Sequence, residues 1–568
     1  MPRVVSIGHQ DFETIRREHY FYVDKTSFIR EWWERGDSVT LLTRPRRFGK
    51  TLTMSMIENF FSLEYAGRGD LFEGLSVWQS EKYRRLQGTY PVISLSFANV
   101  KEPDYKSTIR RINQILSNLY SRNSFLLESG ILDEKERRFF RSVSEDMQEV
   151  TATFAVHQLA FFLARYYGKK VLLLLDEYDT PMQEAYVNGF WEELAVFTRS
   201  LFNASFKTNP YIERALMTGI TRISKESIFS DLNNLKVVTT TSAEYADSFG
   251  FTQEEVTAAL NEFGLSNRRA EVKEWYDGFT FGAKTDIYNP WSIINYLDTK
   301  RLAAYWANSS SNDLIGKLIR EGSKRVKQEF ESLLRREALR FEIDEQIVYD
   351  QLTTKKNAIW SFLLASGYVK VEKMEFSEDT GRACYELALT NKEVRIMFES
   401  MVRDWFAKSA DEYNDFLKAL LADDVKAMNH YMNRVALSTF SYFDTGKNPS
   451  GEEPERFYHG FVLGLMVELA GRYVMTSNRE SGFGRYDVML EPKKESDDAM
   501  ILEFKVRDPA EETDLSDTVR AALEQIERRQ YDAALAARGI PRNRIRKYGF
   551  AFQGKKVLIG SAPTAEKA

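Results

Sequence analysis

The sequence predicts an α/β protein of several domains: a core built around a phosphate-binding loop, a helical lid, a winged-helix-like middle and a C-terminal α/β domain. Three observations carry this prediction. Residues 39–57 (VTLLTRPRRFGKTLTMSMI) have the order of a strand, a phosphate-binding loop and a helix. Residues 171–179 (VLLLLDEYD) show the pattern of a buried strand that ends in acids. SNRESGFGRYDVML and AMILEFKV predict two neighbouring strands that carry acids and a lysine.

Length and composition support several globular domains. The 568 residues, 43% apolar and 28% charged, are too many for one core. We predict domains at residues 1–248, 249–345, 346–409 and 410–568. The single cysteine, Cys384, excludes an intramolecular disulfide and a CxxC metal site. The N-terminus lacks a signal-peptide core, and no apolar run approaches the roughly 18 residues of a membrane helix, so we expect a cytoplasmic protein without membrane contact.

The loop in residues 44–51 predicts a nucleotide-triphosphate site. We expect Lys50 to reach the β- and γ-phosphates and the Thr51 hydroxyl to coordinate Mg²⁺. The P-loop pattern has a glycine where this chain has Arg44, so the loop must turn without it. The alternative is a surface strand–turn–helix with an accidental GKT. The expected nucleotide-binding residues are Arg46, Arg47, Phe48, Gly49, Lys50, Thr51, Leu52 and Thr218.

The acids after the apolar run 171–175 complete the predicted site. Asp176 would hold Mg²⁺ through its water shell, and Glu177 would polarise the water that attacks the γ-phosphate. A strand at 90–97, between these two motifs in sequence, is typical of the additional-strand, catalytic-Glu type of P-loop ATPase. After a further strand, Thr218 or Thr221 could sense the γ-phosphate and Arg222 could supply positive charge. Purely structural roles are the alternative for each.

Two regions follow the predicted core. Residues 249–345 are expected to be mainly helical, and Thr252 with Glu255 forms a capping box. Their aromatic segments at 275–279 and 288–291 are predicted to be loops. Residues 346–409 have the order helix, strand, strand, helix, which is compatible with a winged-helix-like module that either binds DNA or connects domains.

The C-terminal strands predict a metal-dependent phosphodiesterase site. Asp487 lies on one strand, and Glu503 and Lys505, two residues apart on the next, share a face. Carboxylates can hold Mg²⁺, and the lysine can orient the attacking water. The alternative is a cross-strand Glu–Lys pair on a solvated sheet. Glu480 is a further candidate ligand and Gln525 a further candidate for the site; a basic cluster at 541–568 fits a solvated surface or DNA equally.

Together, TRPRRFGKT, LLLLDEYDTP, LMTGITRIS, WYDGF with YNPWS, and the terminal SNRESGFGRYDVML with ILEFKV resemble bacterial AAA-ATPase-like proteins fused to a nuclease-like domain of the PD-(D/E)XK superfamily. The resemblance implies an ATPase core and a restriction-endonuclease-like C-terminal domain. Its nuclease pattern falls on Asp487, Glu503 and Lys505.

The leading hypothesis is therefore an ATPase that uses ATP and Mg²⁺ and controls a DNA nuclease, in defence against foreign DNA. The first alternative is a regulatory ATPase whose nuclease-like domain is a non-catalytic platform for protein or nucleic acid. A third is a switch that senses a peptide or metabolite through its helical middle. A protein partner or a homo-oligomer is compatible with each of them, and Arg46 and Arg47 are expected to contact phosphate or a neighbouring subunit's site.

Overall fold

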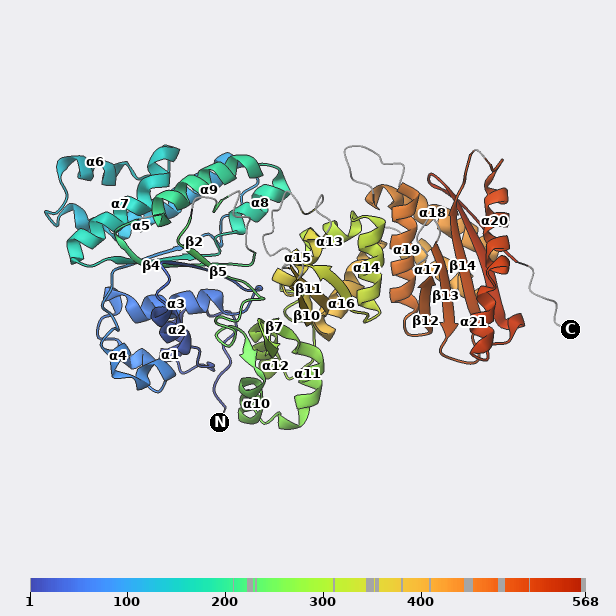
Figure 1. The fold of residues 1–568 in the computed structure, drawn as a ribbon, viewed down its shortest axis with the longest axis horizontal. Coiled ribbons are helices and arrows are strands. Elements are labelled where there is room, and N and C mark those ends of the chain that lie inside the picture. The colour runs from blue at the N-terminus through green and yellow to red at the C-terminus, as the bar shows by residue number, and fades with distance from the viewer. Residues whose placement is uncertain are drawn as a thin grey trace. The chain divides into compact units, whose positions relative to one another are not determined.

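A computed structural model describes residues 2–207, 209–221, 228–229, 232–309, 312–343, 352, 357–378, 382–407, 410–443, 453–478, 486–509 and 511–562. The chain forms two compact units (Figure 1). The first comprises Met1–Ser311 and Ala338–Arg395, and the second Asn312–Glu337 and Ile396–Ala568. The predicted boundaries at 248, 345 and 409 are finer than this division and stay predictions. None of the helices in the described part of the chain has the length and apolar character that a membrane crossing needs.

A five-stranded parallel sheet forms the centre of the first unit. Its strands are β1 (Val39–Thr43), β2 (Val92–Ser96), β3 (Val171–Asp176), β4 (Ile212–Gly219) and β5 (Leu235–Val238), in the order β2-β3-β4-β1-β5. Every residue of β1 and β3 is buried, and for β3 the unbroken apolar run 171–175 predicts this. Because β4 lies between β1 and β3, the carboxyl ends of these three strands meet at one edge.

Helices cover both faces of this sheet (Figure 1). One face carries α1 (Phe12–Arg17), α2 (Ser27–Arg35), α3 (Lys50–Phe61) and α4 (Glu81–Arg84). The other carries α5 (Tyr105–Arg122), α6 (Glu134–Ser142), α7 (Glu149–Tyr167), α8 (Thr180–Asn188) and α9 (Trp191–Phe206). Side-chain caps start several of them; Asp104 accepts from the Ser107 N–H at the start of α5.

The segment after the core contains both a predicted helix and an unpredicted sheet. Helix α10 (Gln253–Glu262) begins with the capping box of Thr252 and Glu255, which confirms that prediction. Helices α11 (Arg269–Tyr276) and α12 (Pro290–Thr299) follow. The aromatic segments predicted as loops instead lie partly in α11 and α12 and partly in a small sheet of β6 (Phe251–Thr252), β8 (Lys284–Tyr288) and β7 (Phe279–Phe281). Strands this short carry too few residues to show a period of two.

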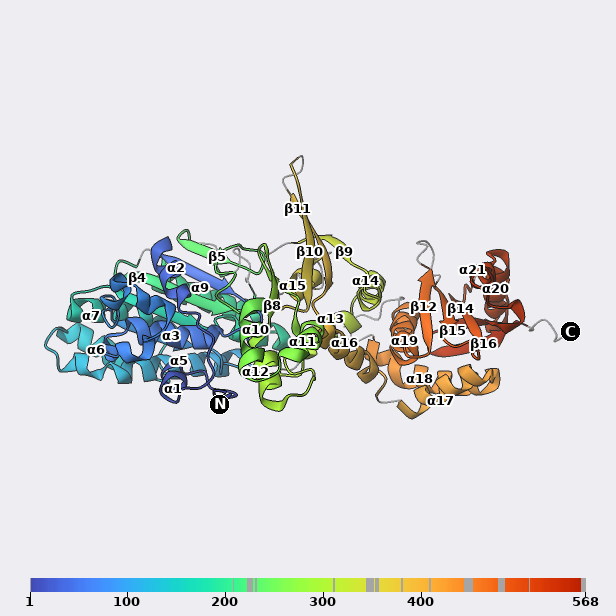
Figure 2. The same cartoon turned by 90° about the horizontal axis from the view of Figure 1, so that it is seen from below.

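The next segment has the predicted order of elements. Helix α15 (Ala358–Ala365), strands β10 (Val369–Ser377) and β11 (Arg382–Leu389), and helix α16 (Lys392–Asp404) follow one another, and Figure 2 shows β10 and β11 side by side as a hairpin. Strand β9 (Leu339–Glu342), which the sequence does not predict, pairs with β11. The winged-helix assignment itself stays a prediction.

The second unit is built on a mixed sheet. Its strands lie in the order β12 (Tyr473–Asn478), β13 (Tyr486–Pro492), β14 (Ala499–Val506), β15 (Ile545–Gln553) and β16 (Lys556–Ser561), and only β14 and β15 pair in parallel. On one face, Phe504 stacks on Phe550 and meets Phe461 of α19. On the other, Ile501 packs with Ile526. Besides most of α16, its helices include α13 (Asp313–Arg320), α14 (Lys324–Leu334), α17 (Ala410–Ala422), α18 (Val425–Phe443), α19 (Glu453–Leu469), α20 (Leu515–Arg528) and α21 (Tyr531–Ala537).

Two asparagines close one edge of this sheet. The side-chain amide of Asn429 on α18 donates to the Ile559 carbonyl and accepts from the Ile559 N–H, both at 2.8 Å. Asn433, one turn later, does the same at Val557, at 2.7 and 3.0 Å. These contacts satisfy backbone groups of β16 that would otherwise be open to another strand.

Candidate functional site

The loop between β1 and α3 turns at Arg47 and Gly49. Both residues have left-handed backbones, with φ of 64° and 85°, and α3 begins immediately afterwards at Lys50. Glycine adopts this conformation without cost, whereas Arg47 does so at some strain. Arg44, at the position where the P-loop pattern has glycine, is not left-handed.

The Arg44 side chain leaves the loop and enters the protein core. It is fully buried, and its guanidinium donates to the carbonyls of Thr43 at 2.9 Å, Thr239 at 2.7 Å and Glu244 at 3.1 Å. It also lies 4.5 Å from the centre of the Phe281 ring. Burial lowers the pKa of Arg44 to about 9, which leaves it charged at pH 7. Arg44 therefore fastens the start of the loop to the chain beyond β5.

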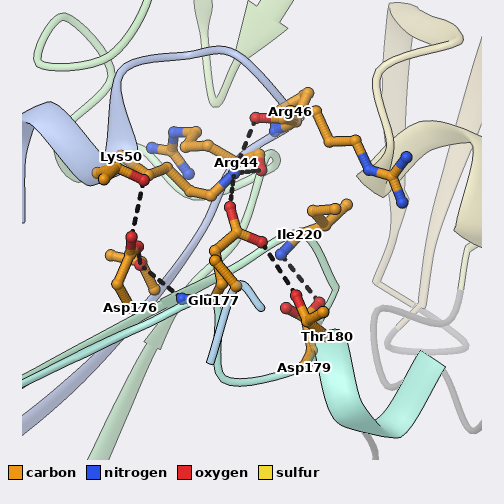
Figure 3. Close-up of polar contacts among 12 residues, drawn as sticks. Arg44, Arg46, Lys50, Asp176, Glu177, Asp179, Thr180 and Ile220 are labelled. Carbon is orange, nitrogen blue, oxygen red and sulfur yellow. Dashed lines mark hydrogen bonds and ion pairs between the residues drawn. The ribbon is translucent and has the colours of Figure 1, made fainter. Parts of the chain in front are cut away.

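The predicted phosphate and magnesium residues lie together (Figure 3). The Lys50 ammonium donates to the carbonyls of Arg44 and Pro45, each at 3.1 Å, and lies 3.6 Å from Glu177 Oε1. Asp176 accepts from the Thr51 hydroxyl at 2.7 Å and from the Thr218 hydroxyl. Burial, and then the neighbouring Glu177 charge, raises the pKa of Asp176. The Lys50 ammonium, the carboxylates of Asp176 and Glu177 and the hydroxyls of Thr51 and Thr218 thus lie together near the carboxyl ends of β3 and β4.

Arg46 contributes its backbone to a different set of contacts. Its carbonyl accepts from the Trp306 indole N–H at 2.9 Å and from the Asn289 amide at 3.3 Å. Its side chain extends away from Lys50 (Figure 3) and donates to Gln183 at 3.2 Å. The phosphate-binding loop is therefore held in place by Gln183, Asn289 and Trp306, which are distant from it in sequence.

The other predicted loop residues have mixed environments. The exposed Arg47 lies 4.4 Å above the ring of Trp291, and Phe48 is buried against Phe279 and Phe281. Leu52 is half-buried in the first turns of α3. Since the Phe48 ring packs into the core, only its backbone is available to a nucleotide. Arg222 lies outside the described residues.

Asp179 is a site residue that the sequence reasoning missed. It is fully buried, and its Oδ2 accepts from the N–H groups of Ile220 and Thr221, at 3.0 and 2.9 Å, and from the Thr221 hydroxyl at 3.1 Å (Figure 3). Thr221, a candidate γ-phosphate sensor, is therefore held by Asp179. Burial raises the pKa of Asp179. The signal in the sequence was the third acid of LLLLDEYD, two residues after Glu177.

Asp487 and Glu503 of the C-terminal sheet lie in one row of paired residues that continues to two glycines. Asp487 pairs with Glu503, Glu503 with Gly549 and Gly549 with Gly560, which confirms the predicted neighbouring strands. A Cβ added at Gly549 would lie 2.9 Å from the Val519 carbonyl oxygen of α20. The two glycines therefore let α20 approach the sheet closely beside Glu503.

Glu503 is a buried carboxylate that has no hydrogen-bond partner in the described part of the chain. It is 0% exposed, and neither of its oxygens has a partner among the residues that the structure describes. The same holds for both amide atoms of Gln525, which is 1% exposed on α20. Lys505 donates to the Ala521 carbonyl of α20 at 3.1 Å. A buried carboxylate without a partner costs several kcal/mol, and Glu503 therefore fits a bound cation.

The structure describes the remaining candidate residues of the C-terminal site only in part. The backbone of Asp487 is described but its side chain is not, and Glu480 lies outside the described residues. Within the described residues, no group of three His, Cys, Asp or Glu side chains is placed to hold a metal. Three residues of the basic C-terminal cluster pair with acids: Arg544 and Arg546 with Asp498, and Lys547 with Glu527. These pairs favour a structural role for these three residues.

Comparisons with known proteins point to the same two regions. Residues 6–229 match the family described as predicted AAA-ATPase, and residues 453–562 match the PD-(D/E)XK nuclease superfamily. The chain is 27% identical over 317 residues to a bacterial protein, "Uncharacterized protein in vnfD 5'region" of Azotobacter chroococcum mcd 1; the match spans 56% of each chain. A solved structure of Drosophila ORC bound to AT-rich DNA and Cdc6 matches 68% of this chain and 92% of that chain, at 14% identity. Its TM-score of 0.19 is too low to carry an argument.

Proposed function

We propose that this chain, which joins an AAA-ATPase-like region to a PD-(D/E)XK nuclease superfamily domain, hydrolyses ATP in its first unit and cuts DNA in its second. One observation carries the nuclease half: Glu503 is fully buried without a hydrogen-bond partner in the described chain, and its strand neighbour is Asp487. A carboxylate in that position is poised for a divalent cation.

The ATPase half is supported by strand order and by the site beside Lys50. One strand separates β1 from β3, as in the additional-strand, catalytic-Glu type. Lys50 would exchange the carbonyls of Arg44 and Pro45 for phosphate oxygens, and Glu177 would then orient the attacking water. Thr51 and Asp176, already hydrogen-bonded to each other, are the residues to hold Mg²⁺. Bound Mg²⁺ neutralises charge that develops on the phosphates.

In the second unit, Asp487 and Glu503 are the residues to hold Mg²⁺, which polarises the scissile phosphate when bound. Lys505 lies on the strand of Glu503 and is held at the α20 backbone, from where its ammonium could orient a water molecule. Gln525, on the same helix, offers an amide to the phosphate or the water. The alternative is a non-catalytic platform, in which the bond from Lys505 to the Ala521 carbonyl has only a structural role.

The ATPase assignment is tested by turnover measurements on the full chain. Lys50→Ala should abolish ATP binding or turnover, whereas Glu177→Gln should bind ATP and fail to hydrolyse it. Lys106→Ala, an exposed lysine on α5, serves as the control. Wild-type turnover in both site variants would refute the assignment.

The metal assignment is tested separately by titration with Mn²⁺ in a calorimeter. Glu503→Gln should weaken binding at least about tenfold, because it removes one of the charged ligands. Glu495→Gln, in the exposed turn between β13 and β14, should bind like the wild type. Equal binding by all three proteins would remove Glu503 from the metal site.

A further inference from the structure

Helix α14 carries buried charged side chains toward the nuclease-like sheet. Lys327 and Glu331 are 1% and 3% exposed, and Arg335 follows after another four residues, so the three share one helix face. Residues 312–337 belong to the second unit, although the residues before and after them in sequence belong to the first. The chain thus tethers α14 to the ATPase-bearing unit at both ends.

The charged face of α14 is hydrogen-bonded to strand β12 at Ser477. The Ser477 hydroxyl donates to Glu331 Oε1, and Arg335 Nη1 lies 3.2 Å from the same hydroxyl and 3.3 Å from Glu331 Oε1. Ser477 is 8% exposed. Because a largely buried ion pair often adds no stability over apolar packing, we infer that this pair serves to hold Ser477 in a defined position.

Ser477 stands next to the row of acids. The residue after it, Asn478, pairs with Asp487, which pairs with Glu503. Strand β12 is the outermost described strand of the sheet on this side, so no strand in the described part of the chain pairs with its other edge. The contact with α14 lies where β12 ends, one residue from the register position of Asp487.

We propose that Glu331 and Arg335 are positioning residues of the nuclease-like site, which act through Ser477 to hold the ends of β12 and β13 so that Asp487 faces the metal with Glu503. This inference rests on the proposed nuclease function. Metal ligands must be held within about half an ångström of their working geometry. Strand β12 pairs only with β13 among the described strands, and the side-chain contact at Ser477 adds a second restraint on it.

The test compares two isosteric replacements of Ser477 in the full chain. Thr keeps the hydroxyl that Glu331 accepts from, whereas Val has the same shape without it. With Mn²⁺ and a linear duplex, Ser477→Val should lower kcat about 10- to 100-fold with KM for DNA within about twofold, as expected for a misplaced catalytic group. Ser477→Thr should keep kcat near the wild-type value. Glu331→Gln should lower kcat as Ser477→Val does. Glu329, on the same helix, pairs with Arg325, and Glu329→Gln should keep the wild-type kcat.

Hydrogen exchange separates failure of this inference from failure of the nuclease function. Ser477→Val should speed amide exchange in β12 and the start of β13, whereas β1 and β3 should be unchanged. If the wild type cuts DNA but Ser477→Val matches Ser477→Thr in kcat and exchange, the inference is wrong. If the wild type cuts nothing, the proposed function is wrong, and equal exchange in the Val and Thr variants would overturn the positioning contact as well.

Discussion

Restoring the consensus glycine at Arg44 should damage this protein. Arg44→Gly removes three hydrogen bonds from a charged donor, each worth about 2 kcal/mol, and a buried three-carbon stem worth about 2.4 kcal/mol. The same change relieves the cost of burying the charge. The pKa falls from 12.5 to about 9 on burial, which corresponds to about 5 kcal/mol. The net effect is a loss of about 3 kcal/mol.

Thermal unfolding of the full chain measures this loss. A chain of two units need not unfold in one step, so the transition to follow is the one that ATP shifts to higher temperature. Arg44→Gly should lower that transition by roughly 4 °C, because the first unit is large, and leave the other unchanged. Arg44→Met keeps an unbranched stem without the charge, and its transition temperature should lie between those of the wild type and Arg44→Gly. If Arg44→Gly is as stable as the wild type and binds ATP more tightly, the guanidinium does not fasten the loop.

Three further changes test other parts of the structure. Burial raises the pKa of Glu393 from 4.5 to about 7, so its contribution to stability is complete below pH 4.5 and is lost as pH rises through 7. Thermal melts at pH 5 and 8 should show a loss of up to about 3 kcal/mol that Glu393→Gln abolishes. Asn429→Ala with Asn433→Ala should cost about 4 kcal/mol for four hydrogen bonds and promote aggregation through β16 in light scattering, whereas Ser438→Ala on the same helix should do neither. Gly549→Ala should push α20 away and cost about 1–3 kcal/mol in denaturant unfolding; Gly471→Ala, which meets open space, should cost little.

Local patterns predicted much of the fold. The five-residue apolar run before Asp176 predicted a strand buried on both faces, and Thr252 with Glu255 predicted the start of a helix. Both motifs act through neighbours within a few residues, which is why the sequence alone suffices. The same reasoning paired the strands of Asp487 and Glu503, because short connections favour adjacent strands.

Contacts between distant residues could not be predicted in this way. Arg44 bonds to carbonyls 195 and 200 residues away, and Ser477 to a glutamate 146 residues away. Nothing in the local sequence marks Arg44 as a core residue rather than a phosphate ligand. The side-chain hydrogen bonds to the outer edge of β16 likewise come from two asparagines on a helix more than a hundred residues earlier. These features arise from packing, and the sequence shows only the polar side chains that take part.

The proposed nuclease function is tested most directly by a DNA cleavage assay on the full chain, with ATP hydrolysis followed in the same reaction. Linear, circular and branched DNA are offered with Mg²⁺ or Mn²⁺, with and without ATP, to wild type and Asp487→Ala. The wild type should cut at least one substrate, and Asp487→Ala should cut none while hydrolysing ATP at the wild-type rate. Wild-type protein that hydrolyses ATP but cuts no DNA with either metal would contradict the nuclease claim and leave a binding platform in its place.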